Sequence, residues 1–81
     1  MKSYKKAARL YQRAVELGDV QSMVGLGFLY EKGQGIKLDT KKAVKYYRMA
    51  AERGYAQAQY NLGICFYNGI GVVQDLSLIH I

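Results

Sequence analysis

Apolar positions recur along the chain at the spacing of an α-helix. Between residues 4 and 17, Ala7, Leu10, Tyr11, Ala14 and Leu17 are separated by three or by one position, which places them on one face of a helix. Gly18 follows, and glycine ends a helix readily because it adopts the left-handed conformation without steric cost. The pattern predicts an amphipathic helix over 4–17 whose apolar stripe turns inward.

Three further helices follow from the same reasoning, over 20–32, 40–53 and 56–68. Asp39 is the expected N-cap of the third, because its carboxylate can accept hydrogen bonds from free amide groups. The side chains that we expect to turn inward are apolar or small: Met23, Leu26, Leu29 and Tyr30 in the second helix, and Ala43, Tyr46, Tyr47, Ala50 and Ala51 in the third.

The chain matches itself when it is shifted by 36 positions. Of the 37 overlapping positions, 13 are identical between residues 3–39 and 39–75. Each repeat holds a first-type helix with a Leu-Gly pair (20–32, 56–68) and a second-type helix with a Lys-Ala pair (4–17, 40–53). Such self-similarity indicates an all-α fold, an α/α solenoid (superhelix) of antiparallel helix pairs with repeats of about 36 residues.

Gly27 and Gly63 occupy the same place in the two first-type helices. Mid-helix glycine costs roughly 0.5–1 kcal/mol relative to alanine. A cost that recurs at the same place predicts a close helix–helix approach at both glycines.

The repeat resembles a known family. It reads Leu26-Gly27-x-x-Tyr30-x-x-Gly33-x-Gly35-Ile36-x-x-Asp39-x-x-Lys42-Ala43-x-x-x-Tyr47-x-x-Ala50-Ala51-Glu52-x-Gly54, and this pattern resembles the Sel-1-like repeat (SLR), a tetratricopeptide-like helical repeat. The resemblance covers residues 3–75, and Tyr46 departs from it where the family often has tryptophan. It implies a right-handed superhelix that acts as a protein–protein interaction scaffold of bacterial type. From the residues themselves we expect no enzymatic activity, cofactor or metal.

An alternative function comes from the same resemblance. Some SLR proteins are linked to β-lactam binding or hydrolysis and carry two disulfide-bonded cysteines in each repeat. Here Leu29 stands at the first-repeat position of Cys65, so we do not carry that activity over. The alternative is a repeat module of an enzyme or enzyme-associated protein, either of the β-lactam-acting SLR type or fused to a catalytic domain.

The repeat register stops at Asp75. The last six residues, Leu76–Ile81, put an apolar run where a polar helix start is due, and they resemble the in-frame translation of a sequencing adapter. We interpret 1–75 as the repeat segment of a longer protein and 76–81 as a non-native tail; a short native apolar C-terminus is the alternative. We expect further repeats, because solenoids generally need at least three.

A partner is expected to bind the concave surface, where the first-type helices differ between repeats. Stacked repeats would place two rows side by side there, and tyrosine in such a row offers contact area with a polar tip. The alternative is that some of these side chains pack against an adjoining repeat. The differing positions are Val24, Phe28 and Glu31 in one helix and their equivalents Tyr60, Ile64 and Tyr67 in the other, and the shared glutamines Gln21 and Gln57 extend each row.

The net charge of +6 changes this picture little. Lys5, Arg9 and Arg13 share one outer helix face, which we interpret as a solvated face whose long stems cover apolar surface. The alternative is a patch for an acidic partner or an anionic lipid. Nucleic acid is not expected, because the aromatic stripes turn inward and would not stack on bases. No apolar stretch approaches the roughly 18 residues of a membrane span.

Candidate chemistry is sparse. One cysteine and one histidine, Cys65 and His80, fall short of a metal site, and a Cys-His pair needs a third, orienting group to be catalytic. We expect Cys65 to be a buried, inert thiol. Gly33-Gln34-Gly35 lacks the Gly, Lys and Ser or Thr of a phosphate loop and predicts a turn.

The ends of the array are expected to be apolar and open. A core of fewer than about 80 residues rarely supplies more than about 3–5 kcal/mol. We therefore expect a weakly stable chain that can self-associate through faces around Tyr4–Tyr11 and Tyr60–Tyr67.

Overall fold

A computed structural model describes residues 3–70 of the chain, and this part is all-α. It contains four helices of 13 residues: α1 (Tyr4–Glu16), α2 (Val20–Lys32), α3 (Thr40–Glu52) and α4 (Ala56–Asn68). α1 and α3 end one residue earlier than predicted, because Leu17 and Arg53 are C-caps and the glycine after each has a positive φ. The predicted tail 76–81, with His80, lies outside the described residues.

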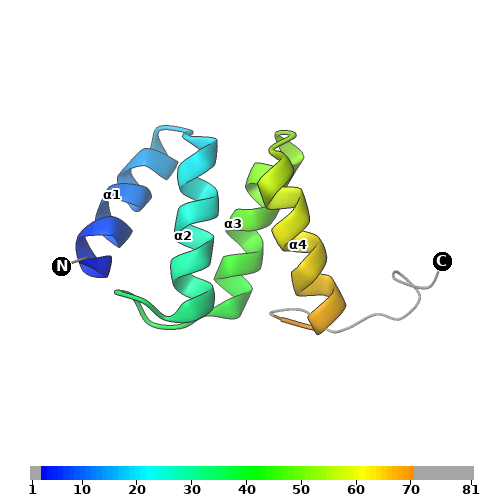
Figure 1. The fold of residues 1–81 in the computed structure, drawn as a ribbon. Coiled ribbons are helices and arrows are strands. Elements are labelled where there is room, and N and C mark those ends of the chain that lie inside the picture. The colour runs from blue at the N-terminus through cyan, green and yellow to red at the C-terminus, as the bar shows by residue number, and fades with distance from the viewer. Residues whose placement is uncertain (1–2, 71–81) are drawn as a thin grey trace.

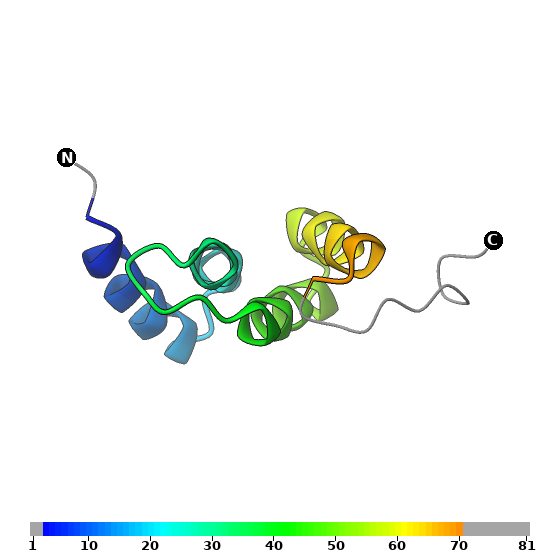
Figure 2. The same ribbon diagram turned by 90° about the horizontal axis from the view of Figure 1, so that it is seen from below.

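The helices form two antiparallel pairs stacked in a row (Figure 1). The second-type helices α1 and α3 lie on one side of the array and the first-type helices α2 and α4 on the other (Figure 2). α3 packs against both α2 and α4, while α1 packs against α2. This is the predicted solenoid architecture, and it leaves the α2–α4 side open between helices.

Short polar side chains start three of the helices. Ser3 accepts a hydrogen bond from the Lys6 amide at 3.3 Å, and Asp39 accepts one from the Lys42 amide at 3.1 Å. The predicted N-cap at Asp39 is thus confirmed, because the side-chain oxygen satisfies an amide that has no partner within the helix. Asp19 caps α2 in the same way, through the amide and the hydroxyl of Ser22.

The core lies between α2 and α3, where the predicted close approach occurs at Gly27. A Cβ at Gly27 would lie 2.8 Å from Cε1 of Tyr47 and 3.1 Å from the carbonyl oxygen of Ala43. Tyr47 is 1% exposed. The glycine therefore lets the α3 backbone and the Tyr47 ring sit directly on α2, and its cost in helix propensity is offset by this contact.

Among residues 3–70 the same close approach does not occur at Gly63. No described atom lies within 4 Å of a Cβ built there, and Gly63 is exposed. The physical reason is that no second-type helix among residues 3–70 lies on α4 as α3 lies on α2. The repeat pattern shows which face of α4 is suited to packing, but a neighbouring helix is needed to bury that face.

Leu10 and Leu17 also depart from the prediction that they turn inward. They are 66% and 88% exposed, and Ala8 is the buried residue of α1. The position of Leu10 in α3 is held by Tyr46, whose ring stacks on that of Tyr30 at 5.8 Å. Leu10 has no such helix beside it in the described chain, so the apolar stripe of α1 is covered on one side only.

The turn after α2 is held against the start of α1. Gly35 has a φ of +71°, in the left-handed region that favours glycine. A Cβ on Gly35 would overlap the backbone of Tyr4 and Lys5. This turn therefore fixes how α1 sits beside α2 and so shapes the groove that lies between them.

Candidate functional groove

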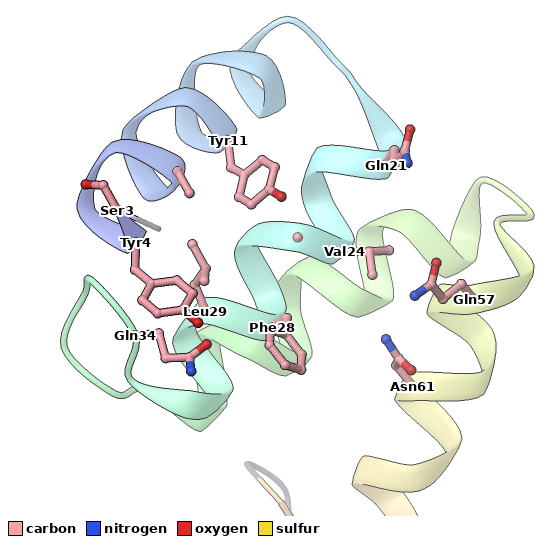
Figure 3. Close-up of a pocket in the computed structure, with 12 residues that line it drawn as sticks. Ser3, Tyr4, Tyr11, Gln21, Val24, Phe28, Leu29, Gln34, Gln57 and Asn61 are labelled. Carbon is pink, nitrogen blue, oxygen red and sulfur yellow. The ribbon is translucent and has the colours of Figure 1, made fainter. Parts of the chain in front are cut away.

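A groove of about 730 Å³ runs along the open side of α2. α2 forms its floor, α1 forms one wall and α4 forms the other (Figure 3). We call it the central groove. It is bordered by Ser3, Tyr4, Ala7, Tyr11, Gln21, Val24, Gly25, Phe28, Leu29, Gln34, Gln57 and Asn61.

The central groove brings together half of the residues predicted from sequence: Gln21, Val24, Phe28 and Gln57. Gln57 projects from α4 toward Val24 of α2, as Figure 3 shows. Val24 is buried and Phe28 is 46% exposed. The floor therefore offers one accessible aromatic ring beside a side-chain amide from each repeat.

The other four predicted residues lie outside the central groove. Glu31 and Ile64 border a small hollow of about 120 Å³ next to Phe28. Tyr60 and Tyr67 line a different side of α4, together with Gly63. Gln57 and Ile64 of the α4 row thus lie toward the α2 row, whereas Tyr60 and Tyr67 line another side of α4.

Sequence reasoning missed Asn61 and Tyr11. Asn61 points from α4 into the central groove, and the Tyr11 ring fills the space between α1 and α2 (Figure 3). A Cβ at Gly25 would lie 2.7 Å from Cζ of Tyr11. Asn61 stands at the repeat position of Gly25, so the search for positions that differ between repeats would have found it.

The lining of the central groove carries no charged side chain. Three primary amides reach it from α2 and α4, namely Gln21, Gln57 and Asn61, and Gln34 adds a fourth from the turn. A primary amide offers two donors and an acceptor. The groove is therefore matched to a neutral ligand that presents both N–H and C=O groups.

A partly buried polar pair joins α2 to α3. The Tyr47 hydroxyl donates to Oε1 of Glu31 at 2.8 Å. Burial, and then the carboxylate of Glu31, raise the pKa of Tyr47 above its usual value of 10.0. Nζ of Lys32 lies 3.8 Å from Oε2 of Glu31. The Glu31 carboxylate is thus held between two partners and anchors the end of α2.

Cys65 is buried, as predicted. Burial, and then the negative charge of Glu31, raise the pKa of its thiol. Both effects disfavour the nucleophilic thiolate. Across residues 3–70, no three His, Cys, Asp or Glu side chains are grouped so that they would hold a metal ion.

Basic side chains collect on the second-type helices. α1 and α3 each contain four basic residues and one acidic one, whereas α4 has no charged residue. Several cations lie over aromatic rings: Lys42 over Tyr30 at 5.5 Å, Lys45 over Tyr46 at 5.6 Å and Arg48 over Phe66 at 5.8 Å. The outer face is therefore basic, and its side chains cover aromatic surface.

Comparison with known proteins decides the family. The Sel1 repeat model matches residues 1–19, 20–55 and 56–78, three consecutive segments that span nearly the whole chain. The chain belongs to the Sel1 repeat family. The middle match has the 36-residue length of the internal repeat.

Solved structures of Sel1 repeat proteins superpose well on this chain. One is c5321, a protective antigen of uropathogenic Escherichia coli with an SLR fold (TM-score 0.87, 36% identity, 90% of this chain and 16% of that chain). Another is a Sel1 repeat protein from Oxalobacter formigenes (TM-score 0.85, 37% identity, 93% and 31%). A third is Helicobacter pylori cysteine rich protein B (TM-score 0.80, 31% identity, 88% and 53%).

The chain thus spans between 16% and 53% of the length of these three proteins. No curated protein matches it. Sel1 repeats are generally protein-interaction modules, and Sel1 repeat proteins are typically non-catalytic scaffolds. None of the four described helices has the length and apolar character that crossing a membrane requires.

Proposed function

We propose that this Sel1 repeat segment is a non-catalytic module that binds an extended, uncharged peptide segment of a partner protein in the central groove. The observation that carries the proposal is the pair Gln21 and Gln57, which occupy the same repeat position and both border the groove. An extended peptide presents alternating N–H and C=O groups, and side-chain amides can pair with both.

The apolar part of the groove favours a peptide with an aliphatic or aromatic side chain. Phe28 is half-exposed beside buried Val24, so a partner side chain that covers the ring removes apolar surface from water. Buried anchors of this kind dominate the energy of protein interfaces. The side chains that line the groove are uncharged, so a charged peptide residue would lose hydration there without gaining an ionic partner, except at the Phe28 end, where Nζ of Lys32 lies 5.8 Å from the ring centroid.

The repeat surface supports binding rather than catalysis. The buried Cys65 thiol and the Tyr47 hydroxyl both have pKa values raised by burial, and this keeps both groups protonated. α1 and α3, which carry most of the basic side chains, lie on the opposite side of the array from the first-type helices (Figure 2). We therefore place the partner on the α2–α4 side.

The test is selection of random peptides displayed on phage against the immobilised 81-residue chain, followed by affinity measurement with synthetic copies. Phe28→Ser and Asn61→Asp alter the central groove, and Lys41→Ser on the exposed start of α3 is the control. We expect each groove variant to weaken binding by about tenfold or more, and the control to change it little.

Two outcomes would contradict the proposal. One is enrichment of acidic peptides whose binding is lost in Lys41→Ser and in high salt, which would place the partner on the outer face. The other is equal binding to wild type and to both groove variants.

A further inference from the structure

A small hollow of about 120 Å³ lies between α2, α3 and α4. Phe28 and Asn61 border both this hollow and the central groove, so the two spaces adjoin. The other residues that line the hollow are Glu31, Lys32, Tyr47 and Ile64. We call it the Glu31 hollow. It is large enough for the end of one side chain, whereas the central groove has room for a length of peptide.

The apolar walls of the Glu31 hollow are accessible. Phe28 is 46% exposed and Ile64 is 39% exposed, and the two stand at the same repeat position. Phe28 stays accessible although α3 packs against α2, so this position lies on the side that stacking of helix pairs leaves open. A planar side chain in the hollow would cover both residues and remove apolar surface from water.

The polar end of the Glu31 hollow is an ion pair whose charges balance. Oε1 of Glu31 accepts the hydrogen bond of the Tyr47 hydroxyl at 2.8 Å, which uses one of the acceptor sites of the carboxylate. Nζ of Lys32 lies 3.8 Å from Oε2, beyond hydrogen-bond distance. The Glu31 side chain is 19% exposed and that of Lys32 is 50% exposed. An acceptor held in place by Tyr47 and a half-exposed donor thus face the same small space.

This balance of charge disfavours a charged partner residue. An acidic side chain in the hollow would meet Glu31 at close range, and juxtaposed like charges weaken binding. A basic side chain would have to displace Lys32, which exchanges one weak ion pair for a similar one. A hydroxyl group avoids both costs, because it can donate to Glu31 and accept from Lys32.

We propose that the Glu31 hollow selects a tyrosine of the peptide bound in the central groove. This inference rests on the proposed function, and it names the side chain that anchors the peptide. The tyrosine ring would lie against Phe28 and Ile64, and its hydroxyl would donate to Oε2 of Glu31. Tyr47 already donates to the other oxygen of this carboxylate, so a phenol is a partner that the group accepts. Tyrosine combines a large contact area with a polar tip, as interface anchors do.

Two relatives of tyrosine should be rejected by the same hollow. Phenylalanine would cover Phe28 but would take water away from Glu31 without supplying a donor, and a site that bonds a hydroxyl rejects the analogue that lacks it. Phosphotyrosine would bring up to about two negative charges next to Glu31. Phosphorylation of the partner tyrosine would therefore release the partner.

The affinities of three synthetic peptides for the full chain, measured by fluorescence anisotropy, test the proposal. The phage selection described above should enrich peptides with tyrosine at one fixed position. Copies of one such peptide carry tyrosine, phenylalanine or phosphotyrosine at that position. We expect wild type to bind the tyrosine peptide about tenfold or more tightly than either of the others.

Two protein variants show whether this preference comes from Glu31. Tyr47→Phe keeps the carboxylate and should retain the preference for tyrosine over phenylalanine. Tyr47→Phe combined with Glu31→Met removes both members of the hydrogen bond, which costs the fold less than removing one of them. This double variant should bind the two peptides within about twofold of each other. Glu52→Gln, which removes an exposed carboxylate of α3, is the matched control and should behave as wild type does.

Gln57→Ala separates this proposal from the proposed function, because Gln57 borders the central groove but not the Glu31 hollow. If Gln57→Ala weakens binding and wild type binds the tyrosine and phenylalanine peptides equally, the tyrosine proposal is overturned and groove binding stands. Selected peptides without a fixed tyrosine, or a double variant that keeps the full preference, also overturn it. If Gln57→Ala and the other groove variants all bind as wild type does, both proposals fail.

Discussion

The same substitution at two repeat-equivalent glycines should change stability in opposite directions. Gly27→Ala adds a methyl group where the Tyr47 ring lies 2.8 Å away and a backbone oxygen of α3 lies 3.1 Å away. Tyr47 is fully buried and its hydroxyl is bonded to Glu31, so the ring cannot move aside at low cost. Gly63→Ala adds the same methyl group where no described atom lies within 4 Å.

The magnitudes follow from two opposing effects. Replacing a mid-helix glycine by alanine stabilises the helix by roughly 0.5–1 kcal/mol at either position. Overpacking at Gly27 costs about 1–3 kcal/mol, which leaves a net loss of up to about 2.5 kcal/mol, centred near 1 kcal/mol. Gly63→Ala keeps the whole gain. The propensity gain is common to both variants, so they differ by the overpacking cost, and for a chain of this size their melting temperatures should differ by about 4 °C or more.

Thermal melts followed by far-UV circular dichroism are the assay, at protein concentrations low enough for the chain to be monomeric. The order should be Gly27→Ala below wild type and wild type below Gly63→Ala. Equal shifts of the two variants, or a Gly27→Ala chain that melts above wild type, would refute the packing argument, because helix propensity alone would then explain both.

Three more outcomes follow from the structure. Gly35→Ala should destabilise the chain by about 2 kcal/mol or more, measured by urea unfolding, because φ is positive and a Cβ would overlap the backbone of Tyr4; wild-type stability would contradict the turn geometry. Asp39→Ala should lower the free energy of unfolding by about 1 kcal/mol in the same assay, since α3 loses its N-cap. Asp39→Asn, which keeps a side-chain oxygen that can accept the hydrogen bond, should retain most of the wild-type stability. The raised pKa of Tyr47 means that the folded chain holds this proton more tightly than the unfolded chain. The contribution of Tyr47 to the free energy of unfolding is therefore complete below pH 10. It decreases above pH 10, by about 1 kcal/mol between pH 10 and 11. Tyr47→Phe should show a correspondingly flatter stability curve over that pH interval, and parallel curves would argue against the buried pair with Glu31.

The helices and the repeat could be predicted from the sequence because helix caps, helix-ending glycines and apolar spacing depend only on residues close together in the chain. Glycine after each helix, an aspartate before α3 and apolar spacing of three and four positions are read directly from the chain. They located four helices with errors of one residue at two C-terminal ends.

Exposure could not be predicted in the same way, because it depends on neighbours. Leu10 and Gly63 belong to stripes that are buried in the equivalent helix, yet both are exposed where no described helix covers them. The repeat shows which face of each helix is suited to packing. The presence of a packed neighbour has to be seen in the structure.

Part of the candidate site could be predicted from the sequence, but the orientation of its helices could not. Comparing the repeats located Gln21, Phe28 and Gln57, but it did not show which side of α4 faces α2. That depends on how α3 sets the rotation of α4 relative to α2. Tyr60 and Tyr67 were therefore predicted to share a surface from which the structure separates them.

The most direct test of the proposed function is an NMR titration of the ¹⁵N-labelled chain with a phage-selected peptide. The account predicts that amide shift changes concentrate along the central groove, at the backbone and side-chain amides of Gln21, Phe28, Gln57 and Asn61. The exposed lysines and arginines of α1 and α3 should keep their shifts. Changes confined to the basic outer faces, with the groove amides unmoved, would contradict it.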